Sequence, residues 1–294
     1  MQFGYMSMNT AAGPRPARLA KELEDRGFES WWVPEHGHIP TSRATPHPST
    51  NPLPSGYLHM MNPFVSLAAA SAVTEKLILG TAVSLILQHD VVDLATEVAS
   101  LDVISEGRLV LGIGVGWNRE ELADHRPDLA FKLRYRAQEE RVAALRQLWT
   151  DSEAGFEGRW DKVSPCWLFP KPTNGTVPIS LGNWGPIGLQ HAARYADEWM
   201  PVDAYLRDAD GKPDPAGAIA HFRHLVEQAG RDPDSVPVSI LLFSRPTPSR
   251  LERYAAAGVK RVVASAPTAE LVDADFIMRD VDEITPIMQD YYKG

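Results

Sequence analysis

The chain has 294 residues, of which 44% are hydrophobic, an ordinary share for a globular protein. Its net charge is −9 and no Lys/Arg cluster stands out, which argues against nucleic acid or an anionic membrane as the main partner. The one cysteine, Cys166, excludes an internal disulfide and a cysteine-based metal cluster. The first residues show no secretion signal, and no apolar run approaches the length of a bilayer span. We therefore expect a soluble cytoplasmic enzyme.

Short apolar runs alternate with stretches of helical period along the whole chain. The expected strands are residues 3–6, 30–34, 77–83, 109–113, 178–182, 198–201, 238–243 and 259–264. The expected helices are residues 15–26, 63–74, 90–105, 134–149, 186–195, 215–229, 247–256 and 268–291. Uninterrupted apolar strands are typical of a parallel sheet covered by helices on both faces. Eight βα units predict an α/β fold of the closed (β/α)8 TIM-barrel type, with a doubly wound open sheet as the alternative.

Two connections are longer than a minimal barrel needs. Residues 35–61, after the second strand, are rich in Pro, Ser, Thr and His, and a loop of this length is usually a functional lid or disordered. Residues 151–177, after the fourth helix, interleave Trp160, Trp167 and Phe169 with prolines, which favours a flap packed on the barrel. No stretch has the composition of a hinge between domains. We expect one domain over residues 1–294.

The run LDVISEGRLVLGIGVGW, residues 101–117, predicts the end of a helix, a stop at Gly107 and a buried strand. Gly112, Gly114 and Gly116 alternate where that strand ends. Because alternate side chains of a strand point to opposite faces, these glycines leave one face bare. Such a face admits either a flat ligand such as a flavin ring or a closely packed neighbouring backbone. Trp117 stands where a dinucleotide-binding fingerprint needs its third glycine, so a Rossmann site is not expected.

Active sites of TIM barrels lie at the C-terminal ends of the strands. Glu35 and His36 follow the second strand, where a carboxylate beside an imidazole can bind, donate or accept protons. His36 and His38 also have a spacing known from metal ligands, as in a metal hydrolase. No third or fourth ligand follows the other strands, so we expect no metal.

The fifth strand leads into the sequence Gly-Asn-Trp-Gly-Pro, residues 182–186, and then into a helix. Glycines at a helix N-terminus expose backbone N–H groups at the positive end of the helix dipole, which suits a phosphate. Pro186 fits the first position of a helix. A simple turn would have a similar sequence.

Several segments resemble the bacterial luciferase-like monooxygenase superfamily, and especially its deazaflavin (F420)-dependent branch. The central one is GTAVSLILQHDVVDLATEVASLDVISEGRLVLGIGVGW, residues 80–117. Others are LEDRGFESWWVPEH, MNPFVSLAAASAVTEKLILGT, LRQLWT and AARYADEWMP, which agree in order and spacing. The resemblance covers about residues 3–265.

The resemblance implies a (β/α)8 barrel with a flavin or deazaflavin at the C-terminal face. It implies that Glu35 and His36 lie near the reactive ring. It also implies a non-proline cis peptide between Ala82 and Val83, which forms a bulge behind the ring. The glycines of the fourth strand would then give the cofactor a path toward a phosphate site at residues 182–185.

The chain also departs from the family pattern. A sugar-phosphate dehydrogenase of the family has its proton-donating carboxylate where this chain has Trp117, and here Glu120 and Glu121 come slightly later. No set of Lys and Arg matches a sugar-phosphate site. The proton donor is therefore open, and we expect a moderately hydrophobic organic substrate instead of a sugar phosphate.

We accordingly expect an oxidoreductase that transfers a hydride between coenzyme F420 and an unidentified organic substrate. His36 would orient and protonate at the reacting centre, with Glu35 holding it or contacting the ring. The expected cofactor-binding residues are Ala82, Val83, Gly114, Gly116, Trp117, Gly182, Asn183 and Trp184. The expected substrate-binding residues, in a lid that closes over the site, are His38, Tyr57 and His59, together with His47.

Two alternatives keep the same fold. An FMN-dependent monooxygenase would use a flavin that forms a peroxide with oxygen, and a non-catalytic cofactor-binding barrel would have lost the reaction. Because relatives are often dimers, the resemblance also suggests a homodimer.

Overall fold

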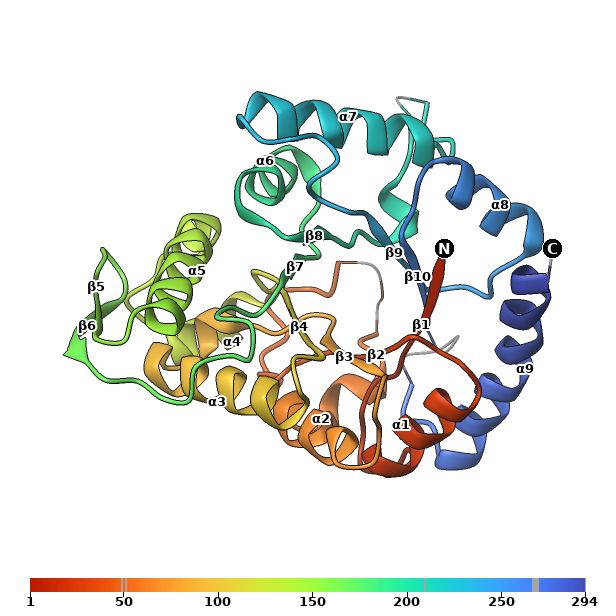
Figure 1. Cartoon of the computed structure of the whole chain (residues 1–294), viewed down its shortest axis with the longest axis horizontal. Helices are drawn as coiled ribbons and strands as arrows, with labels where there is room; N and C mark the ends of the chain where they lie inside the picture. Colours follow the sequence, from red (N-terminus) through yellow and green to blue (C-terminus); the bar gives the residue numbers. More distant parts are fainter. Residues whose placement is uncertain (49, 51, 209, 266–269, 294) are drawn as a thin grey trace.

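The structure, a computed structural model, describes residues 1–48, 50, 52–208, 210–265 and 270–293. Its centre is a ring of parallel strands (Figure 1). In order around the ring these are β8 (Glu198–Trp199), β7 (Ile179–Leu181), β4 (Leu109–Ile113), β3 (Ile78–Thr81), β2 (Ser30–Val33), β1 (Gln2–Met6), β10 (Arg261–Ser265) and β9 (Ser239–Leu242). Bridges from Trp199 to Val238 and from Val202 to Leu241 close the ring between β8 and β9. The eight predicted strands and the TIM-barrel class are confirmed, and the open doubly wound sheet is wrong.

Helices surround the ring of strands on its outside (Figure 1). They are α1 (Pro16–Asp25), α2 (Pro63–Ser71), α3 (Val91–Ile104), α5 (Arg134–Thr150), α6 (Gly185–Tyr195), α7 (Pro215–Gln228), α8 (Pro248–Ala256) and α9 (Ala274–Lys293). The start of α3 shows how the sequence sets a boundary, because the Asp90 carboxylate accepts from the backbone N–H groups of Val92 and Asp93. None of the helices in these described ranges has the length and apolarity that a bilayer crossing requires.

The helices differ from the expectation in two places. Helix α9 begins at Ala274 and not at residue 268; residues 268 and 269 lie outside the described part of the chain. A short helix, α4 (Arg119–His125), follows β4 and was not predicted. Its first turn is capped by Asn118, whose side-chain oxygen accepts from the N–H groups of the second and third helical residues.

The two long connections have different structures. Residues 151–177 contain an antiparallel hairpin of β5 (Ala154–Glu157) and β6 (Lys162–Cys166), so the predicted flap is folded. The lid, residues 35–61, contains the 3-10 turn η1 (Ser55–Leu58). Other 3-10 turns are η2 (Ile86–Gln88), η3 (Phe131–Leu133) and η4 (Asp203–Tyr205).

The indole of Trp32 is fully buried inside the barrel, where it packs in a cluster with Met6, Met200, Leu241 and Val263. Glycine is required around it, because a Cβ on Gly80 would lie 2.3 Å from the Trp32 ring. A Cβ on Gly112 would lie 1.8 Å from the carbonyl oxygen of Thr81. Because Gly80 and Gly112 carry no Cβ, strands β3 and β4 can approach closely at their C-terminal ends. The Arg261 guanidinium also contacts Trp32, at 5.4 Å from the centre of an indole ring.

Replacing Gly112 by alanine tests this packing. We expect the free energy of unfolding to fall by about 1–3 kcal/mol, since the added methyl would displace the β3 backbone. In Gly37→Ala, the matched control, the new Cβ would meet its nearest atom at 3.8 Å, and we expect a change within about 0.5 kcal/mol. Urea unfolding followed by tryptophan fluorescence measures both. Equal stability of the two variants would contradict the packing argument.

Candidate active site

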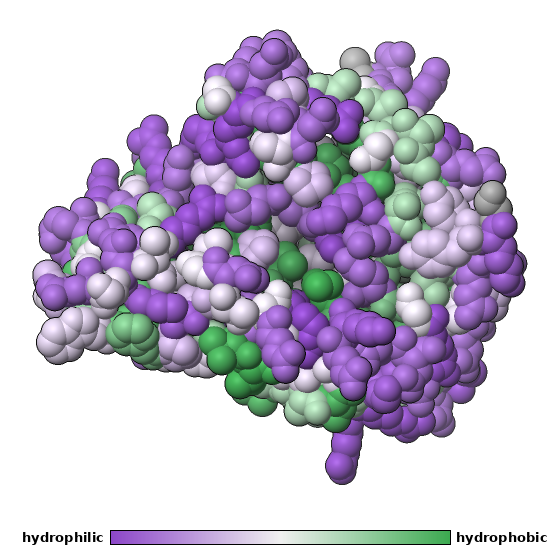
Figure 2. Space-filling view, viewed as in Figure 1, coloured by the Kyte–Doolittle hydropathy of each residue, from purple (hydrophilic) through white to green (hydrophobic). Residues whose placement is uncertain are grey.

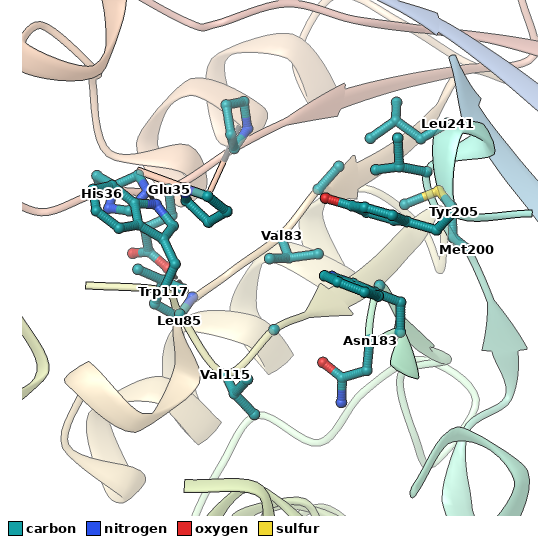
Figure 3. A pocket seen from close by; sticks show the side chains of 18 of the residues that line it. Glu35, His36, Val83, Leu85, Val115, Trp117, Asn183, Met200, Tyr205 and Leu241 are labelled. Atoms are coloured by element: carbon teal, nitrogen blue, oxygen red, sulfur yellow. Dashed lines mark hydrogen bonds between the residues drawn. The ribbon is translucent and has the colours of Figure 1, made fainter. Parts of the chain in front are cut away.

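A cavity of about 590 Å³ lies at the C-terminal ends of the strands and is lined mostly by apolar side chains. Figure 2 shows hydrophobic side chains in the middle of the face over the strands, with hydrophilic ones around them. Of the residues expected at the site, eleven line the cavity: Glu35, His36, Tyr57, Ala82, Val83, Gly114, Gly116, Trp117, Gly182, Asn183 and Trp184. Figure 3 shows Val83 in the middle, with His36 and Trp117 on one side and Tyr205 and Met200 on the other.

The floor of the cavity is a bulge after β3. The peptide bond between Ala82 and Val83 is cis, as the family resemblance implied. The chain rejoins β4 at once, because Ser84 N–H donates to the Gly112 carbonyl at 2.7 Å and Gly114 N–H donates to the Ser84 carbonyl at 3.1 Å. The Val83 side chain projects into the cavity from this bulge (Figure 3).

The glycines of β4 have a different immediate role from the one expected. A Cβ on Gly114 would lie 2.4 Å from a methyl of Val83, and one on Gly182 would lie 3.0 Å from the other methyl. These glycines therefore make room for the bulge, which occupies the bare face of the strand.

Glu35 holds the segment that follows the bulge. Its carboxylate accepts hydrogen bonds from Ser84 Oγ and from Leu85 N–H, each at 2.7 Å, and lies 2.7 Å from His89 Nε2. Burial raises the pKa of Glu35, but the bonds from these three partners outweigh burial and lower it below its ordinary value. Burial lowers the pKa of His89, but Glu35 outweighs that effect and raises it. Both shifts favour the charged forms, so the two side chains form a partly buried ion pair.

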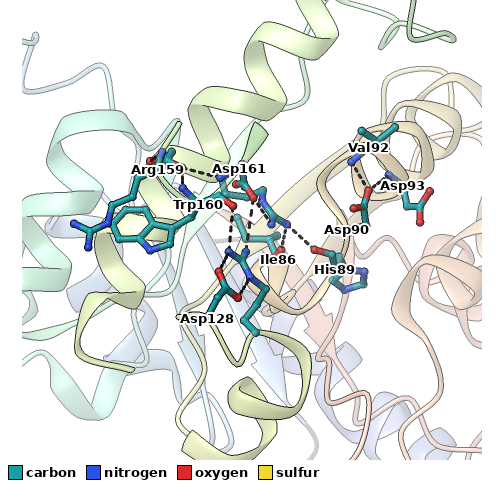
Figure 4. Close-up of polar contacts among 12 residues, drawn as sticks. Ile86, His89, Asp90, Val92, Asp93, Asp128, Arg159, Trp160 and Asp161 are labelled. Carbon is teal, nitrogen blue, oxygen red and sulfur yellow. Dashed lines mark hydrogen bonds and ion pairs between the residues drawn. The ribbon is translucent and has the colours of Figure 1, made fainter. Parts of the chain in front are cut away.

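Arg141 holds the same segment from the opposite side. It is buried on α5 and donates to the backbone carbonyls of Ile86 at 2.6 Å and His89 at 2.8 Å. Its charge is balanced by Asp161 of the hairpin turn, at 2.6 and 2.7 Å (Figure 4). The insertion after α5 thus helps to fix the floor of the cavity.

His36 is held at both ring nitrogens. Nδ1 lies 2.8 and 3.0 Å from the two carboxylate oxygens of Glu121, which is fully buried. The Trp117 indole N–H donates to His36 Nε2 at 3.2 Å. Because a carboxylate only accepts and an indole N–H only donates, the proton of the neutral ring is on Nδ1 and the lone pair is on Nε2. The expectation that Glu35 holds His36 is wrong; Glu121 does so.

The lid is fastened to α4 and to the segment before α9. Its His38 lies 2.9 Å from Asp124, its Thr45 N–H donates to Glu120 at 3.1 Å, and its Ser55 N–H donates to Glu270 at 3.1 Å.

The lid histidines therefore differ in their positions. The rings of His47 and Tyr57 are centred 5.0 Å apart, and Tyr57 faces His36 at 5.5 Å. His38 and His59 are exposed and do not line the cavity. The expectation that they bind substrate together with Tyr57 is therefore corrected: of these three residues, Tyr57 lines the cavity.

The opposite end of the cavity is formed by the N-terminus of α6. Trp184 stacks on Tyr205, with ring centres 4.0 Å apart, and Asn183 Nδ2 donates to Gln138 at 2.9 Å. Among the residues that the structure describes, no side chain caps the first N–H groups of α6. Arg134 lines the cavity, and its Nε is buried with no hydrogen-bond partner among the described residues. These donors suit an anionic group such as a phosphate.

No three His, Cys, Asp or Glu side chains gather as a ligand set for a metal in the ranges that the structure covers. His36 and His38, the ligands of the metal alternative, are instead paired separately with Glu121 and Asp124.

Comparison with known proteins places the chain in a family. The sequence model of one family, described as luciferase-like monooxygenase, matches residues 1–283. The chain belongs to this luciferase-like family. It is 37% identical over 279 residues to an uncharacterised protein of Mycobacterium tuberculosis, covering 93% of this chain and 95% of that protein.

Two further matches show the range of the luciferase-like family. An F420-dependent hydroxymycolic acid dehydrogenase of M. tuberculosis is 27% identical over 76% of this chain and 57% of that protein. The crystal structure of a monooxygenase from Streptomyces bottropensis superimposes with a TM-score of 0.72 at 18% identity, covering 99% of this chain and 100% of that one, and thus shares the fold. The chain therefore resembles an F420-dependent dehydrogenase in sequence and a monooxygenase in fold.

Sequence reasoning missed two polar residues of this luciferase-like site, His89 and Arg141, and it noted Glu121 only as a carboxylate after the fourth strand, without its contact to His36. Glu121, His89 and Arg141 lie outside the stretches that directly follow the strands. A signal existed for Glu121, because Asn118 three positions earlier is a helix cap that places it in the first turn of a helix next to the fourth strand. For the other two, only the tertiary fold shows their partners.

Replacing Glu35 by glutamine tests the buried pair. We expect the free energy of unfolding to fall by about 1–3 kcal/mol near pH 6, since the charge-assisted bond between Glu35 and His89 is lost and His89, no longer favoured as the cation, gives up its proton. Because the pKa of His89 is raised in the folded protein, the charged imidazole stabilises the fold below pH 6.5, its ordinary pKa. This stabilisation is lost as the pH rises through the pKa that His89 has in the folded protein. Because the pKa of Glu35 is lowered in the folded protein, the carboxylate stabilises the fold above pH 4.5, its ordinary pKa. This stabilisation is lost as the pH falls through the pKa that Glu35 has in the folded protein.

The difference between the wild type and Glu35→Gln should therefore be largest between pH 4.5 and 6.5 and should shrink at pH 9. Urea unfolding at pH 6 and pH 9 measures it. Asp124→Asn, which removes the exposed partner of His38, is the control and should change stability by about 0.5 kcal/mol or less. A difference that stays constant with pH would exclude the ion pair.

Proposed function

We propose that this protein is an oxidoreductase that transfers a hydride between coenzyme F420 and a small, mostly apolar organic substrate. One observation carries the proposal: the same cavity is lined by the raised apolar side chain of Val83 and by the His36 imidazole, whose lone pair is on Nε2. A planar ring fits on such a floor, and a proton acceptor beside it suits a reaction in which a hydride and a proton both move. The F420-dependent relative supports this choice of coenzyme.

The residues present fit the coenzyme. Val83 and Gly114 would lie under the ring, and the uncapped N–H groups at the start of α6 would hold a phosphate. The unpartnered Nε of Arg134 supplies a positive charge at the same end. When bound, F420 supplies a two-electron hydride donor or acceptor. Ala82, Gly116, Trp117, Gly182, Asn183 and Trp184 complete the proposed coenzyme contacts.

His36 would hold or release the proton at Nε2. The buried carboxylate of Glu121 lies against Nδ1 and would stabilise the imidazolium that forms when Nε2 gains a proton. Glu35 has no part in this transfer, because its carboxylate is bonded to Ser84, Leu85 and His89. The lid with Tyr57 would exclude water from the reacting atoms.

Binding of the coenzyme is the first test. The purified protein is titrated with F420 and, separately, with FMN, and binding is followed by fluorescence quenching or absorbance. We expect saturable binding of F420 that weakens when Arg134 is replaced by methionine, because an anion partner is lost. Tight binding of FMN with none of F420 would replace the proposal by an FMN-dependent monooxygenase.

The role of His36 is tested by its replacement with alanine. With F420 and any substrate that the wild type turns over, we expect kcat to fall by about 10²–10⁴, since the group that moves the proton is lost. F420 affinity should change little. His38→Ala, at an exposed position outside the cavity, is the control and should keep the wild-type rate. An unchanged rate in His36→Ala would remove His36 from the chemistry, and F420 binding without turnover of any substrate would favour a non-catalytic barrel.

A further inference from the structure

Two arginines at the rim of the cavity share one aromatic ring. Arg134, the first residue of α5, has its guanidinium carbon 4.0 Å from the ring centre of Phe131. Arg119, the first residue of α4, has its guanidinium carbon 4.8 Å from the same ring centre. The Arg134 guanidinium donates to the Phe131 carbonyl at 3.1 Å. Within the described part of the chain neither arginine has a carboxylate partner, so two positive charges lie close together without a negative one.

The start of α5 concentrates further positive charge at this place. Lys132 comes two residues before the helix and Arg136 is its third residue, and both are exposed. The first turn holds no acidic residue, and no side chain of the described residues caps it. Cations are unfavourable there, because the N-terminus of a helix is the positive end of its dipole. Burial lowers the pKa of Arg134 below its ordinary value, and the charge of Arg119 adds to this effect.

The carboxylates of the neighbouring helices do not neutralise this charge. Glu120, next to Arg119, accepts from the Thr45 N–H at 3.1 Å. The others are bonded elsewhere: Glu121 to His36, Asp124 to His38, Asp128 to Arg126, Glu139 to Arg194, and Glu140 to backbone N–H groups of the hairpin turn. The positive charge around Phe131 is therefore available to an anionic ligand.

The two arginines continue the row of donors at the α6 end of the cavity. Arg134 lines the cavity, and its buried Nε has no partner among the described residues. Gln138 lies one turn later on the same face of α5 and is fully buried. Its Oε1 accepts from Asn183 Nδ2 at 2.9 Å, while its Nε2 also lacks a described partner. Since Arg119 is exposed and does not line the cavity, the donors extend from the start of α6 out to the protein surface.

We propose that Arg119 and Arg134 bind a carboxylate of the coenzyme that lies beyond its phosphate, and that this contact favours F420 over FMN. F420 continues past its phosphate into a chain that carries glutamate carboxylates, whereas FMN ends at its phosphate. FMN would therefore leave Arg119 without an anion. A guanidinium can bind a carboxylate through two parallel N–H···O bonds, which suits this role.

This inference rests on the proposed coenzyme binding and adds to it a specificity-determining residue, Arg119. The phosphate at the start of α6 is common to both coenzymes and does not distinguish them. The choice between them is assigned to the positive charge outside the cavity.

The first test measures dissociation constants by fluorescence quenching or absorbance for F420, for the same coenzyme without its glutamates, and for FMN. We expect Arg119→Met to raise the dissociation constant of F420 about ten-fold, the factor that corresponds to the loss of one charge-assisted hydrogen bond. The values for the glutamate-free coenzyme and for FMN should not change. Because Arg119 is exposed, the variant should keep its fold.

Arg159→Met is the matched control. Arg159 is also exposed and lies 5.1 Å from an aromatic ring centre, that of Trp160, but it belongs to the hairpin turn and does not line the cavity (Figure 4). This variant should keep the wild-type affinity for F420. An unchanged affinity in Arg119→Met, or an equal loss for F420 and its glutamate-free form, would overturn the inference while leaving the proposed function intact. Binding of FMN without any binding of F420 would overturn both.

The second test contains no coenzyme. The thermal midpoint of the protein is measured at low salt with a γ-linked triglutamate and, as the uncharged comparison, with triglycine. We expect triglutamate to raise the midpoint of the wild type and of Arg159→Met but not of Arg119→Met, because a ligand that binds the folded state stabilises it. An equal rise in all three proteins, or no rise in the wild type, would contradict a carboxylate site at Arg119.

Discussion

The carboxylate of Glu35 is the contact on which the floor of the cavity depends. It is buried, and its partners are a side chain, a backbone N–H and an imidazole in one stretch of chain, residues 84–89. Arg141 holds the carbonyl groups of the same stretch and is neutralised by the hairpin. Because removing one partner of a buried charge is strongly destabilising, each of these two charged groups ties the segment to its position.

The position of the floor follows from the barrel interior. Trp32 lies inside the ring of strands, and Gly80 and Gly112 let β3 and β4 approach each other around it. Directly after β4, Gly114 makes room for Val83, so the bulge rises into the cavity between the end of β4 and the end of β7. One series of glycines therefore sets both the packing of the core and the surface that faces the ligand.

Periodicity in the sequence was enough to predict the eight strands and their helices, because apolar runs and capping residues are local signals. The pairing at the site was not local. Glu35 and His36 are neighbours in the sequence, but Glu35 lies against His89 and His36 lies against Glu121. Glu121 is 85 positions from His36, and only the tertiary fold, in which β2 and β4 both flank β3, brings the two together. The cis peptide was implied by family resemblance, since Ala-Val itself gives no such signal.

A crystal structure of the protein with F420 bound tests the central claim most directly. The account predicts that the deazaflavin ring lies on Val83, with the bulge and the Glu35 contacts unchanged and with His36 Nε2 beside the reactive edge of the ring. A ring bound away from Val83, or a Glu35 carboxylate that has left Ser84 and Leu85 to bond with His36, would contradict it.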